Sequence, residues 1–198
     1  MKLEQTNRII IKIGSALLFN ETSGSLNKEW LNSLAEDVKY LRENDKEVII
    51  VSSGAIAMGA KDLDLDMKNM KMDMNQAVSA VGQIHLMGSF KSAFEKNEIK
   101  ISQILLTLDD TEQRRRSINA RRTIDTLLKL GIVPVVNEND TIATSEIRYG
   151  DNDRLASRVA QITSADCLIL LSNINGLYSA DPSTCLLYTS DAADDFTS

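Results

Sequence analysis

The sequence predicts an α/β fold in which a mainly parallel sheet carries helices on both faces. Along the 198 residues, short runs rich in β-branched residues alternate with longer segments of helical period. The short runs are apolar on both faces, which is typical of strands buried inside a parallel sheet. No internal repeat and no linker rich in Pro, Gly or Ser divides these elements, so they are expected to form one sheet.

The expected strands are the short apolar runs. In chain order they cover residues 8–14, 47–52, 101–107, 132–137 and 167–172. The expected helices lie between them and cover 28–43, 75–96, 117–130 and 152–163. The first helix is amphipathic. In the second, Val78, Val81 and Ile84 recur at a spacing of three and therefore share one face. Gly131 follows the third helix and is a favourable residue for ending it.

Two segments have a less regular pattern. Residues 67–74 hold four methionines and form either a flap or the entry to the long helix, and the helix entry is favoured. Residues 141–150 alternate Ile142, Thr144, Glu146 and Arg148 between turn-like clusters, which predicts a small hairpin.

Composition excludes several classes of function. The chain has 22 basic and 28 acidic residues, a net charge of −6 and a pI near 4.9, which argues against nucleic acid as a partner. The basic run Arg114–Arg116 is interleaved with acids and has no aromatic neighbour, so a solvated helix face explains it. No apolar stretch is long enough to span a bilayer and no signal peptide is visible, so no membrane partner and a cytoplasmic location are expected.

Several catalytic motifs are also missing from the sequence. There is no P-loop, no Gly-x-Gly-x-x-Gly, no paired-cysteine zinc spacing and no His-Glu-x-x-His, so no metal site is predicted. Cys167 and Cys185 do not make a disulfide framework. The single histidine, His85, lies in a helical stretch and is interpreted as structural.

The ends of the expected strands indicate where a ligand binds. Four of the five strands end in small, polar or glycine residues: Lys12-Ile13-Gly14-Ser15, Ser52-Ser53-Gly54-Ala55, Asn137-Glu138-Asn139-Asp140 and Ser172-Asn173-Ile174-Asn175-Gly176. Each group alone has a structural explanation, as an edge lysine, a helix cap or a turn. In open parallel sheets, however, ligands bind outside the carboxyl ends of the strands. The coincidence of four such groups therefore favours a site at this edge.

The residue types suggest phosphoryl transfer. Gly14 and Gly54 allow backbone N–H groups to approach an oxyanion, and the helical stretch after Gly54 adds positive potential. Lys12 is a compact cation suited to a phosphate, whereas Asp140 suits an ammonium group or a metal ion. No histidine is placed to act as a base, and a carboxylate acceptor needs none because it is already ionised at neutral pH.

The segment 150–153, Gly-Asp-Asn-Asp, opens the last expected helix. Its carboxylates either cap that helix or face the site, since Asp and Asn are favoured N-cap residues. Both interpretations stay open at this point.

Eight short segments resemble the amino acid kinase family, and within it the branch that phosphorylates glutamate. They are Ile11–Ser15, Val51–Ile56, Ala80–Gln83, Gln103–Thr107, Asn119–Arg121, Pro134–Asp140, Gly150–Asp153 and Gly176–Pro182. The resemblance runs from about residue 8 to 182. The pair Asn-Glu-Asn-Asp and Gly-Asp-Asn-Asp at this spacing is its most specific part.

The resemblance implies a three-layer sandwich and transfer of the ATP γ-phosphate to the side-chain carboxylate of L-glutamate, the first step of proline synthesis. ATP and Mg²⁺ are the implied cofactors, proline a possible feedback inhibitor, and a homo-oligomer the implied assembly. The implied roles fall on nine residues: Lys12 on the phosphates, Gly14, Ser172 and Asn173 on the nucleotide, Ser53, Asn137, Asp140 and Asn152 on glutamate, and Asp153 orienting Lys12. Many family members carry Thr-Asp at 172–173, so this chain lacks a carboxylate there.

The resemblance stops near the C-terminus. Residues 1–184 are expected to form the kinase domain, incomplete because the family's Gly-rich segment with a second lysine is missing. Residues 185–198 contain no Lys, Arg or Gly and match no family motif, so a disordered or non-native tail is expected. With half of the nucleotide site missing, the 198-residue chain itself is expected to have little or no activity.

Three alternatives stay open. One is another member of the family, such as an acetylglutamate, aspartate, carbamate or uridylate kinase. Another is the kinase half of a bifunctional pyrroline-carboxylate synthase, which shares these motifs. The third is a non-catalytic module that binds an amino acid, although such a module is expected to have lost Lys12.

Overall fold

The computed structural model describes residues 3–20, 25–68, 70–143 and 151–173. Within them the chain forms, in order, a 3₁₀ turn η1 (Leu3–Gln5), β1 (Arg8–Ile13), α1 (Ser15–Leu18), α2 (Lys28–Glu43), β2 (Glu47–Ser52), α3 (Ala55–Asp62), α4 (Met72–Glu95), β3 (Ile101–Leu106), α5 (Leu108–Glu112), α6 (Arg114–Lys129), β4 (Val133–Glu138), α7 (Asp151–Thr163) and β5 (Cys167–Leu171).

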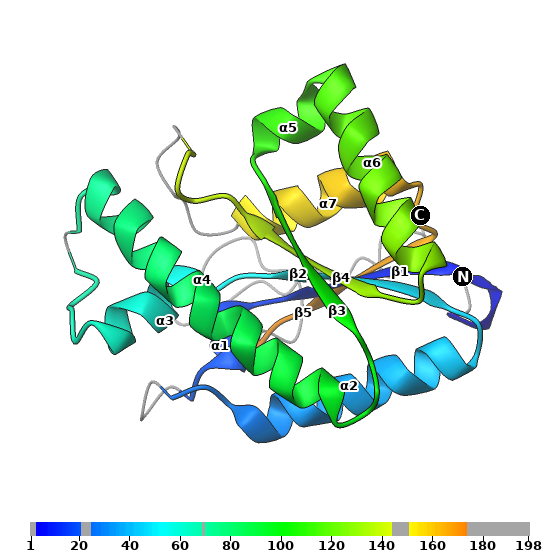
Figure 1. Ribbon diagram of the computed structural model, residues 1–198, viewed down its shortest axis with the longest axis horizontal. Coiled ribbons are helices and arrows are strands. Elements are labelled where there is room, and N and C mark those ends of the chain that lie inside the picture. The colour runs from blue at the N-terminus through cyan, green and yellow to red at the C-terminus, as the bar shows by residue number, and fades with distance from the viewer. Residues whose placement is uncertain (1–2, 21–24, 69, 144–150, 174–198) are drawn as a thin grey trace, which may run out of the picture.

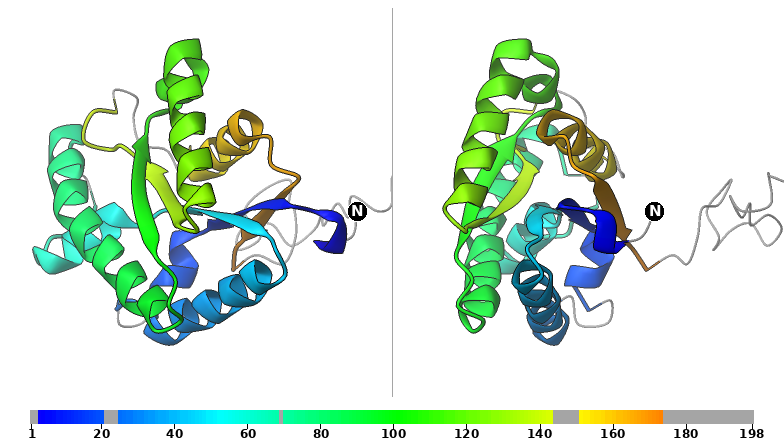
Figure 2. Two further views of the ribbon diagram at one scale, coloured as in Figure 1. Left: turned by 45° about the vertical axis from the view of Figure 1, so that its right-hand side comes forward. Right: turned by 90° about the vertical axis from the view of Figure 1, so that its right-hand side faces the viewer.

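The five strands form one sheet in the order β3-β4-β2-β1-β5, and every neighbouring pair is parallel. The chain moves along the sheet in one direction from β1 to β3 and then returns through β4 to β5. Right-handed crossovers require the two directions to use opposite faces of the sheet. Accordingly, α2 and α4 lie on one side of the sheet and α6 and α7 on the other (Figures 1 and 2). The predicted α/β class, with helices on both faces, is confirmed.

Two apolar clusters fill the spaces between the layers. In β1, Ile9, Ile11 and Ile13 join the cluster under α2 and α4, whereas Ile10 joins the cluster under α6 and α7. This alternation follows from the period of two along a strand. The three central strands β1, β2 and β4 are therefore buried on both faces, as their apolar runs predict, whereas the edge strands β3 and β5 are only partly buried.

Helices α3 and α4 approach each other through two glycines. A Cβ on Gly82 would lie 1.8 Å from the carbonyl oxygen of Ala55, and a Cβ on Gly59 would lie 1.9 Å from that of Val78. No side chain fits between these backbones, so the two helices are in direct backbone contact. Because α3 starts just after Ser53, this contact fixes α4 next to the end of β2.

The expected boundaries agree with the structure to within one residue, apart from the starts of two helices: α4 begins at Met72 and α6 at Arg114. The helix-entry interpretation of residues 67–74 holds for Met72–Met74, whereas Lys71 and the described residues before it precede the helix. Of the expected hairpin, residues 144–150 lie outside the described residues, and residues 141–143 include a turn. The helices α1 and α5 were not expected; they are four and five residues long, too short to show a helical period.

Candidate active site

The carboxyl ends of all five strands meet at one edge of the sheet because every neighbouring pair is parallel. The predicted site residues lie in or directly after these strand ends, or in the first turn of α7: Lys12 in β1, Gly14 after it, Ser53 after β2, Asn137 in β4, Asp140 after it, Asn152 and Asp153 in α7, and Ser172 and Asn173 after β5. The topology therefore brings together residues that are up to 161 positions apart in sequence.

Lys12 forms an ion pair with the first turn of α7. Its side chain projects from the same face of β1 as Ile10, which is the face that α7 covers. Its Nζ atom lies 2.6 Å from Oδ1 of Asp153, and the two side chains are 12% and 50% exposed, respectively. The cation is thus largely enclosed and held in one position, while its carboxylate partner stays accessible. The carboxylate of Asp153 contacts the site lysine, which favours the second of the two interpretations of segment 150–153.

A chain of amide groups crosses the sheet edge between α4, β4 and α7. The Asn152 Nδ2 group donates to the backbone oxygen of Ser52 at 2.6 Å and to Oδ1 of Asn137 at 3.1 Å. The same Oδ1 accepts the N–H of Glu138 at 2.9 Å, and Asn137 Nδ2 donates to Oε1 of Gln83 at 2.8 Å. Two predicted site residues, Asn137 and Asn152, are therefore in direct contact.

Asp140 lines a cavity of mixed polar and apolar lining next to this chain. Its Oδ2 accepts a hydrogen bond from the Ser79 hydroxyl at 2.5 Å, and both residues are buried. The cavity has a volume of about 240 Å³ and is lined by residues of α4, β3 and the end of β4: Ser79, Ala80, Gln83, Ile84, Gln103, Leu105, Glu138, Asn139, Asp140 and Thr141. A buried carboxylate beside a cavity of this kind favours a cationic ligand group such as an ammonium.

The loops after β1 and β2 lie side by side. The Ser53 hydroxyl donates to the backbone oxygen of Ile13 at 3.1 Å, which links the two strand ends. Gly54 has a φ of 100°, a left-handed conformation that favours glycine, and a Cβ there would lie 2.7 Å from the Phe19 ring. The N–H of Gly14 donates to the Leu171 oxygen at 3.1 Å, so the close approach at Gly14 is to β5.

Ser172 and Asn173 directly follow the register pair formed by Ile13 and Leu171, and both are exposed. They therefore lie beside the end of β1, on the far side of Lys12 from Asn137 and Asp140. Along the strand order, Ser172 and Asn173 thus lie on one side of Lys12, and Ser53, Asn137 and Asp140 lie on the other.

One carboxylate at this edge has a clearly shifted pKa. Burial would raise the pKa of Asp110, but hydrogen bonds from the N–H and hydroxyl of Thr107, together with Arg116, lower it overall. Thr107 and Asp110 form a capping box that starts α5. Asp110 therefore stays ionised as a structural cap.

The comparisons with known proteins agree with this geometry. The family model described as "Amino acid kinase family" matches residues 7–198. The chain belongs to the amino acid kinase family. The resemblance found in the sequence is confirmed by this match and by the relatives below.

Curated relatives of this amino acid kinase carry the name glutamate 5-kinase. One from Pelagibacter ubique is 60% identical over 182 residues, which are 92% of this chain and 49% of the relative. One from Rhodospirillum rubrum is 56% identical over 87% of this chain and 46% of the relative. The chain thus spans about half the length of the curated relatives it matches.

A solved structure shares the fold. The isopentenyl phosphate kinase of T. acidophilum superposes with a TM-score of 0.60 at 15% identity, over 91% of this chain and 76% of that chain. At this identity the likeness supports the amino acid kinase fold alone. The division at residue 184 stays a prediction, because residues 174–198 lie outside the described part of the chain.

The structure adds two residues to the amino acid kinase site that the sequence analysis did not place there. Ser79 and Gln83 lie one turn apart on α4, and each donates to or accepts from a predicted site residue. The sequence contains a signal for them, because both are polar and lie among the apolar residues of the predicted helix 75–96. Without knowing which strand end α4 passes, their partners could not be named.

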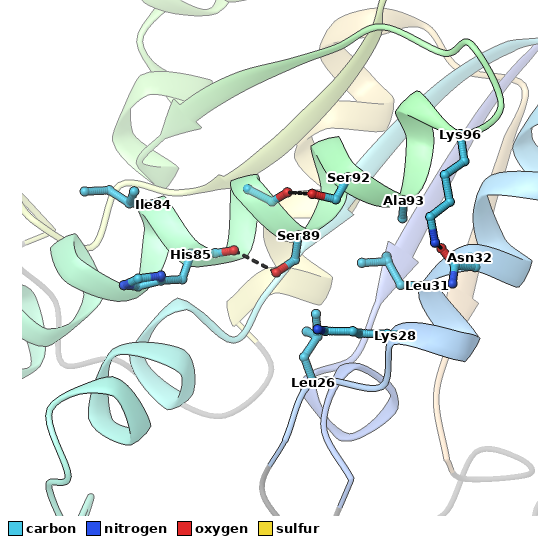
Figure 3. A pocket seen from close by; sticks show the side chains of 11 residues that line it. Leu26, Lys28, Leu31, Asn32, Ile84, His85, Ser89, Ser92, Ala93 and Lys96 are labelled. Atoms are coloured by element: carbon cyan, nitrogen blue, oxygen red, sulfur yellow. Dashed lines mark hydrogen bonds between the residues drawn. The ribbon is translucent and has the colours of Figure 1, made fainter.

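A larger cavity of about 600 Å³ lies between α2 and α4 (Figure 3). Its lining includes Leu31, Lys96 and His85, and Lys96 Nζ donates to Asn32 at 3.0 Å across it. None of the predicted site residues lines this cavity. His85 Nε2 lies 3.2 Å from Asp62, which joins α4 to α3 and agrees with its structural interpretation.

The described residues contain no group of three or more His, Cys, Asp or Glu that could hold a metal ion. None of their helices combines the length and apolar character needed to cross a bilayer.

Proposed function

We propose that this amino acid kinase transfers the γ-phosphoryl group of ATP to the side-chain carboxylate of L-glutamate, giving glutamyl 5-phosphate. The observation that carries the proposal is the enclosed Lys12, paired with Asp153 at 2.6 Å, at the edge that also holds Ser53, Asn137, Asp140 and Asn152. The names of the relatives support the choice of glutamate. Since the chain spans about half of those relatives, the activity is proposed for the whole protein.

Lys12 is the proposed phosphate contact. Its ammonium group would stabilise the charge on the transferring phosphoryl oxygens, and Asp153 would hold Nζ in the position where that charge develops. Gly14, Ser172 and Asn173, on the β5 side of Lys12, are the proposed contacts to the nucleotide. This arrangement leaves the β2–β4 side of Lys12 for the acceptor.

Glutamate would bind on that second side. The buried carboxylate of Asp140 would take the substrate ammonium, while Ser53, Asn137 and Asn152 would fix its carboxylate groups through hydrogen bonds. The acceptor carboxylate is ionised at neutral pH, so the reaction needs no general base. Positioning and charge stabilisation would supply most of the catalysis.

Mg²⁺ is proposed to accompany ATP, where it would neutralise phosphate charge. The described residues hold no carboxylate cluster for it, so phosphate oxygens and water would be its main ligands. Proline as an inhibitor at the glutamate site, a homo-oligomeric assembly and a cytoplasmic location complete the proposal.

The test is ATP-dependent ADP formation by the purified full-length gene product with L-glutamate, L-aspartate, N-acetylglutamate, carbamate or UMP as the acceptor, and γ-glutamyl hydroxamate formation identifies the product made from L-glutamate. We expect turnover with L-glutamate alone and its loss in Lys12→Ala. Lys39→Ala, an exposed lysine on α2, is the matched control and keeps full activity. Turnover of another acceptor, or wild-type activity in Lys12→Ala, contradicts the proposal.

A further inference from the structure

Two side chains of α4, Ser79 and Gln83, line the cavity and contact predicted substrate residues. The proposed reaction gives neither of them a role. Ser79 and Gln83 are buried, at 3% and 8% exposure, although both are polar and lie in the middle of a helix. A buried polar side chain costs free energy unless it is hydrogen-bonded. Among the described residues, the side chain of each has one hydrogen-bond partner, and in each case that partner belongs to the site.

Ser79 acts on Asp140. Its hydroxyl donates to Oδ2 at 2.5 Å, so one oxygen of the carboxylate is held by a short, charge-assisted hydrogen bond. That bond limits rotation of the carboxylate and stabilises its ionised form. An ionised and fixed carboxylate is what a substrate ammonium requires.

Gln83 forms a hydrogen bond with Asn137, and the neighbouring groups allow only one orientation of each side-chain amide. The backbone N–H of Glu138 holds Asn137 Oδ1, so Asn137 Nδ2 must face Gln83. Gln83 must then present Oε1, since a reversed amide would place two N–H groups against each other. The same Asn137 Oδ1 accepts a hydrogen bond from Asn152 Nδ2, so the orientation of Asn137 also determines that of the Asn152 amide on α7.

The remaining amide group of Gln83 supports this interpretation. Its Nε2 is buried and has no hydrogen-bond partner among the described residues. An unpaired buried donor is costly, on the order of 1–3 kcal/mol. This orientation is the one that pairs Gln83 Oε1 with Asn137 Nδ2.

We propose that Ser79 and Gln83 are positioning residues of the substrate site: Ser79 fixes the Asp140 carboxylate, and Gln83 fixes Asn137 and, through it, Asn152. The inference rests on the proposed function in so far as the substrate is L-glutamate. The backbone contact of α3 with α4 at Gly59 and Gly82 fixes the position of α4 along the sheet edge. Because Gly82 directly precedes Gln83, this contact also fixes where Ser79 and Gln83 lie relative to Asp140 and Asn137.

The test uses Ser79→Ala and Gln83→Met, with Ser89→Ala and Gln161→Met as matched controls. Ser89 lies on the same helix, is half-buried and, among the described contacts, bonds only its own turn, to the His85 oxygen. Gln161 is exposed on α7. Unfolding in urea is measured for all variants, so that a folding defect is not mistaken for loss of positioning.

The first readout needs no ligand. By NMR on the 198-residue chain, the pKa of Asp140 is expected to rise in Ser79→Ala, because its carboxylate loses a donor. The side-chain amide signals of Asn137 and Asn152 are expected to shift in Gln83→Met. Unchanged signals in folded variants overturn the proposal.

The second readout is calorimetric titration of L-glutamate, in the same chain and in the full-length product. Each test variant is expected to bind glutamate at least about tenfold more weakly, with ATP binding to the full-length product unchanged. Wild-type affinity in both variants overturns the positioning roles while leaving the proposed function intact. If the wild-type full-length product binds no glutamate but the NMR shifts appear, the proposed substrate is wrong and the positioning pair stands.

Discussion

Lys12 Nζ lies 2.6 Å from Asp153 Oδ1, which joins the end of β1 to the first turn of α7. The two residues are 141 positions apart in sequence, and the pairing exists because α7 returns over the face of the sheet from which Lys12 projects. Replacing the carboxylate by an amide in Asp153→Asn keeps the shape and removes the charge. We expect kcat of the full-length product to fall by about 10²-fold with little change in the KM for glutamate, because a displaced lysine mainly affects the transition state.

The control for this prediction is Asp37→Asn, an exposed acid on α2, which should leave kcat unchanged. Steady-state kinetics of the hydroxamate reaction provide the measurement. A variant of Asp153 with wild-type kcat would show that the ion pair is only structural.

Gly82→Ala should destabilise the fold by about 1–3 kcal/mol, because its Cβ would lie 1.8 Å from the Ala55 oxygen, and backbone cannot move aside as a side chain can. Gly88→Ala is the matched control on the same helix, since a Cβ there meets nothing within 4 Å. That control should stabilise the protein by up to about 1 kcal/mol through its higher helix propensity. Urea unfolding measures both; equal effects of the two substitutions would contradict the close contact.

Asp166 links stability to pH at the opposite edge of the sheet. Its carboxylate accepts the N–H groups of Arg8 and Asn7, at 2.9 and 2.7 Å, and these hydrogen bonds lower its pKa. A lowered folded-state pKa contributes stability above the unfolded value, near 3.9, and this is lost as the pH falls through the folded pKa.

Asp166→Asn should therefore be less stable than wild type at pH 7, and the difference should shrink as the pH falls below about 4. Urea unfolding at a series of pH values measures it, with Asp37→Asn as the control. A pH-independent difference would mean that the negative charge of Asp166 is not involved.

The substitution Asn152→Asp tests whether the Asn152 side chain is the hydrogen-bond donor in the chain of amide groups. The Nδ2 donor faces two acceptors, the Ser52 oxygen at 2.6 Å and Asn137 Oδ1 at 3.1 Å, and a carboxylate would repel both. We expect a loss of about 1–3 kcal/mol in stability and weaker glutamate binding. Asn119→Asp, at an exposed position on α6, should change neither in urea unfolding and calorimetry. Retained stability and binding in Asn152→Asp would show that the amide is not the donor.

Most of the fold could be predicted from the sequence because the strands are apolar and because α2, α6 and α7 have a clear amphipathic period, whereas α4 has apolar residues on its exposed as well as its buried side. The short helix α5 could have been found from its Thr-x-x-Asp capping box, whereas α1 has no comparable signal: its preceding Gly14 makes no side-chain cap. Strand order cannot be read from periodicity, and it decides which strand ends are neighbours.

The sequence predicted those residues of the candidate site that lie at the ends of single strands or in a local motif. Lys12, Ser53 and Asp140 are each recognisable from residue type and place in a motif, and the motif at 150–153 indicated Asp153 as a partner of Lys12. Ser79 and Gln83 could not be assigned, because their role depends on which side of α4 meets β4. That relationship is a matter of tertiary packing, and no local pattern contains it.

The glycine contact between α3 and α4 has a consequence for redesign. Where two helices meet through side chains, a larger or smaller residue changes their spacing, and the change is passed to whatever the helices carry. Here the spacing is set by backbone atoms at Gly59 and Gly82, so substitutions elsewhere on α3 or α4 should leave the distance between the two helices unchanged. A version of this protein that accepts a shorter or longer amino acid should instead be sought by substituting side chains that line the cavity, such as Ala80, Ile84 and Thr141.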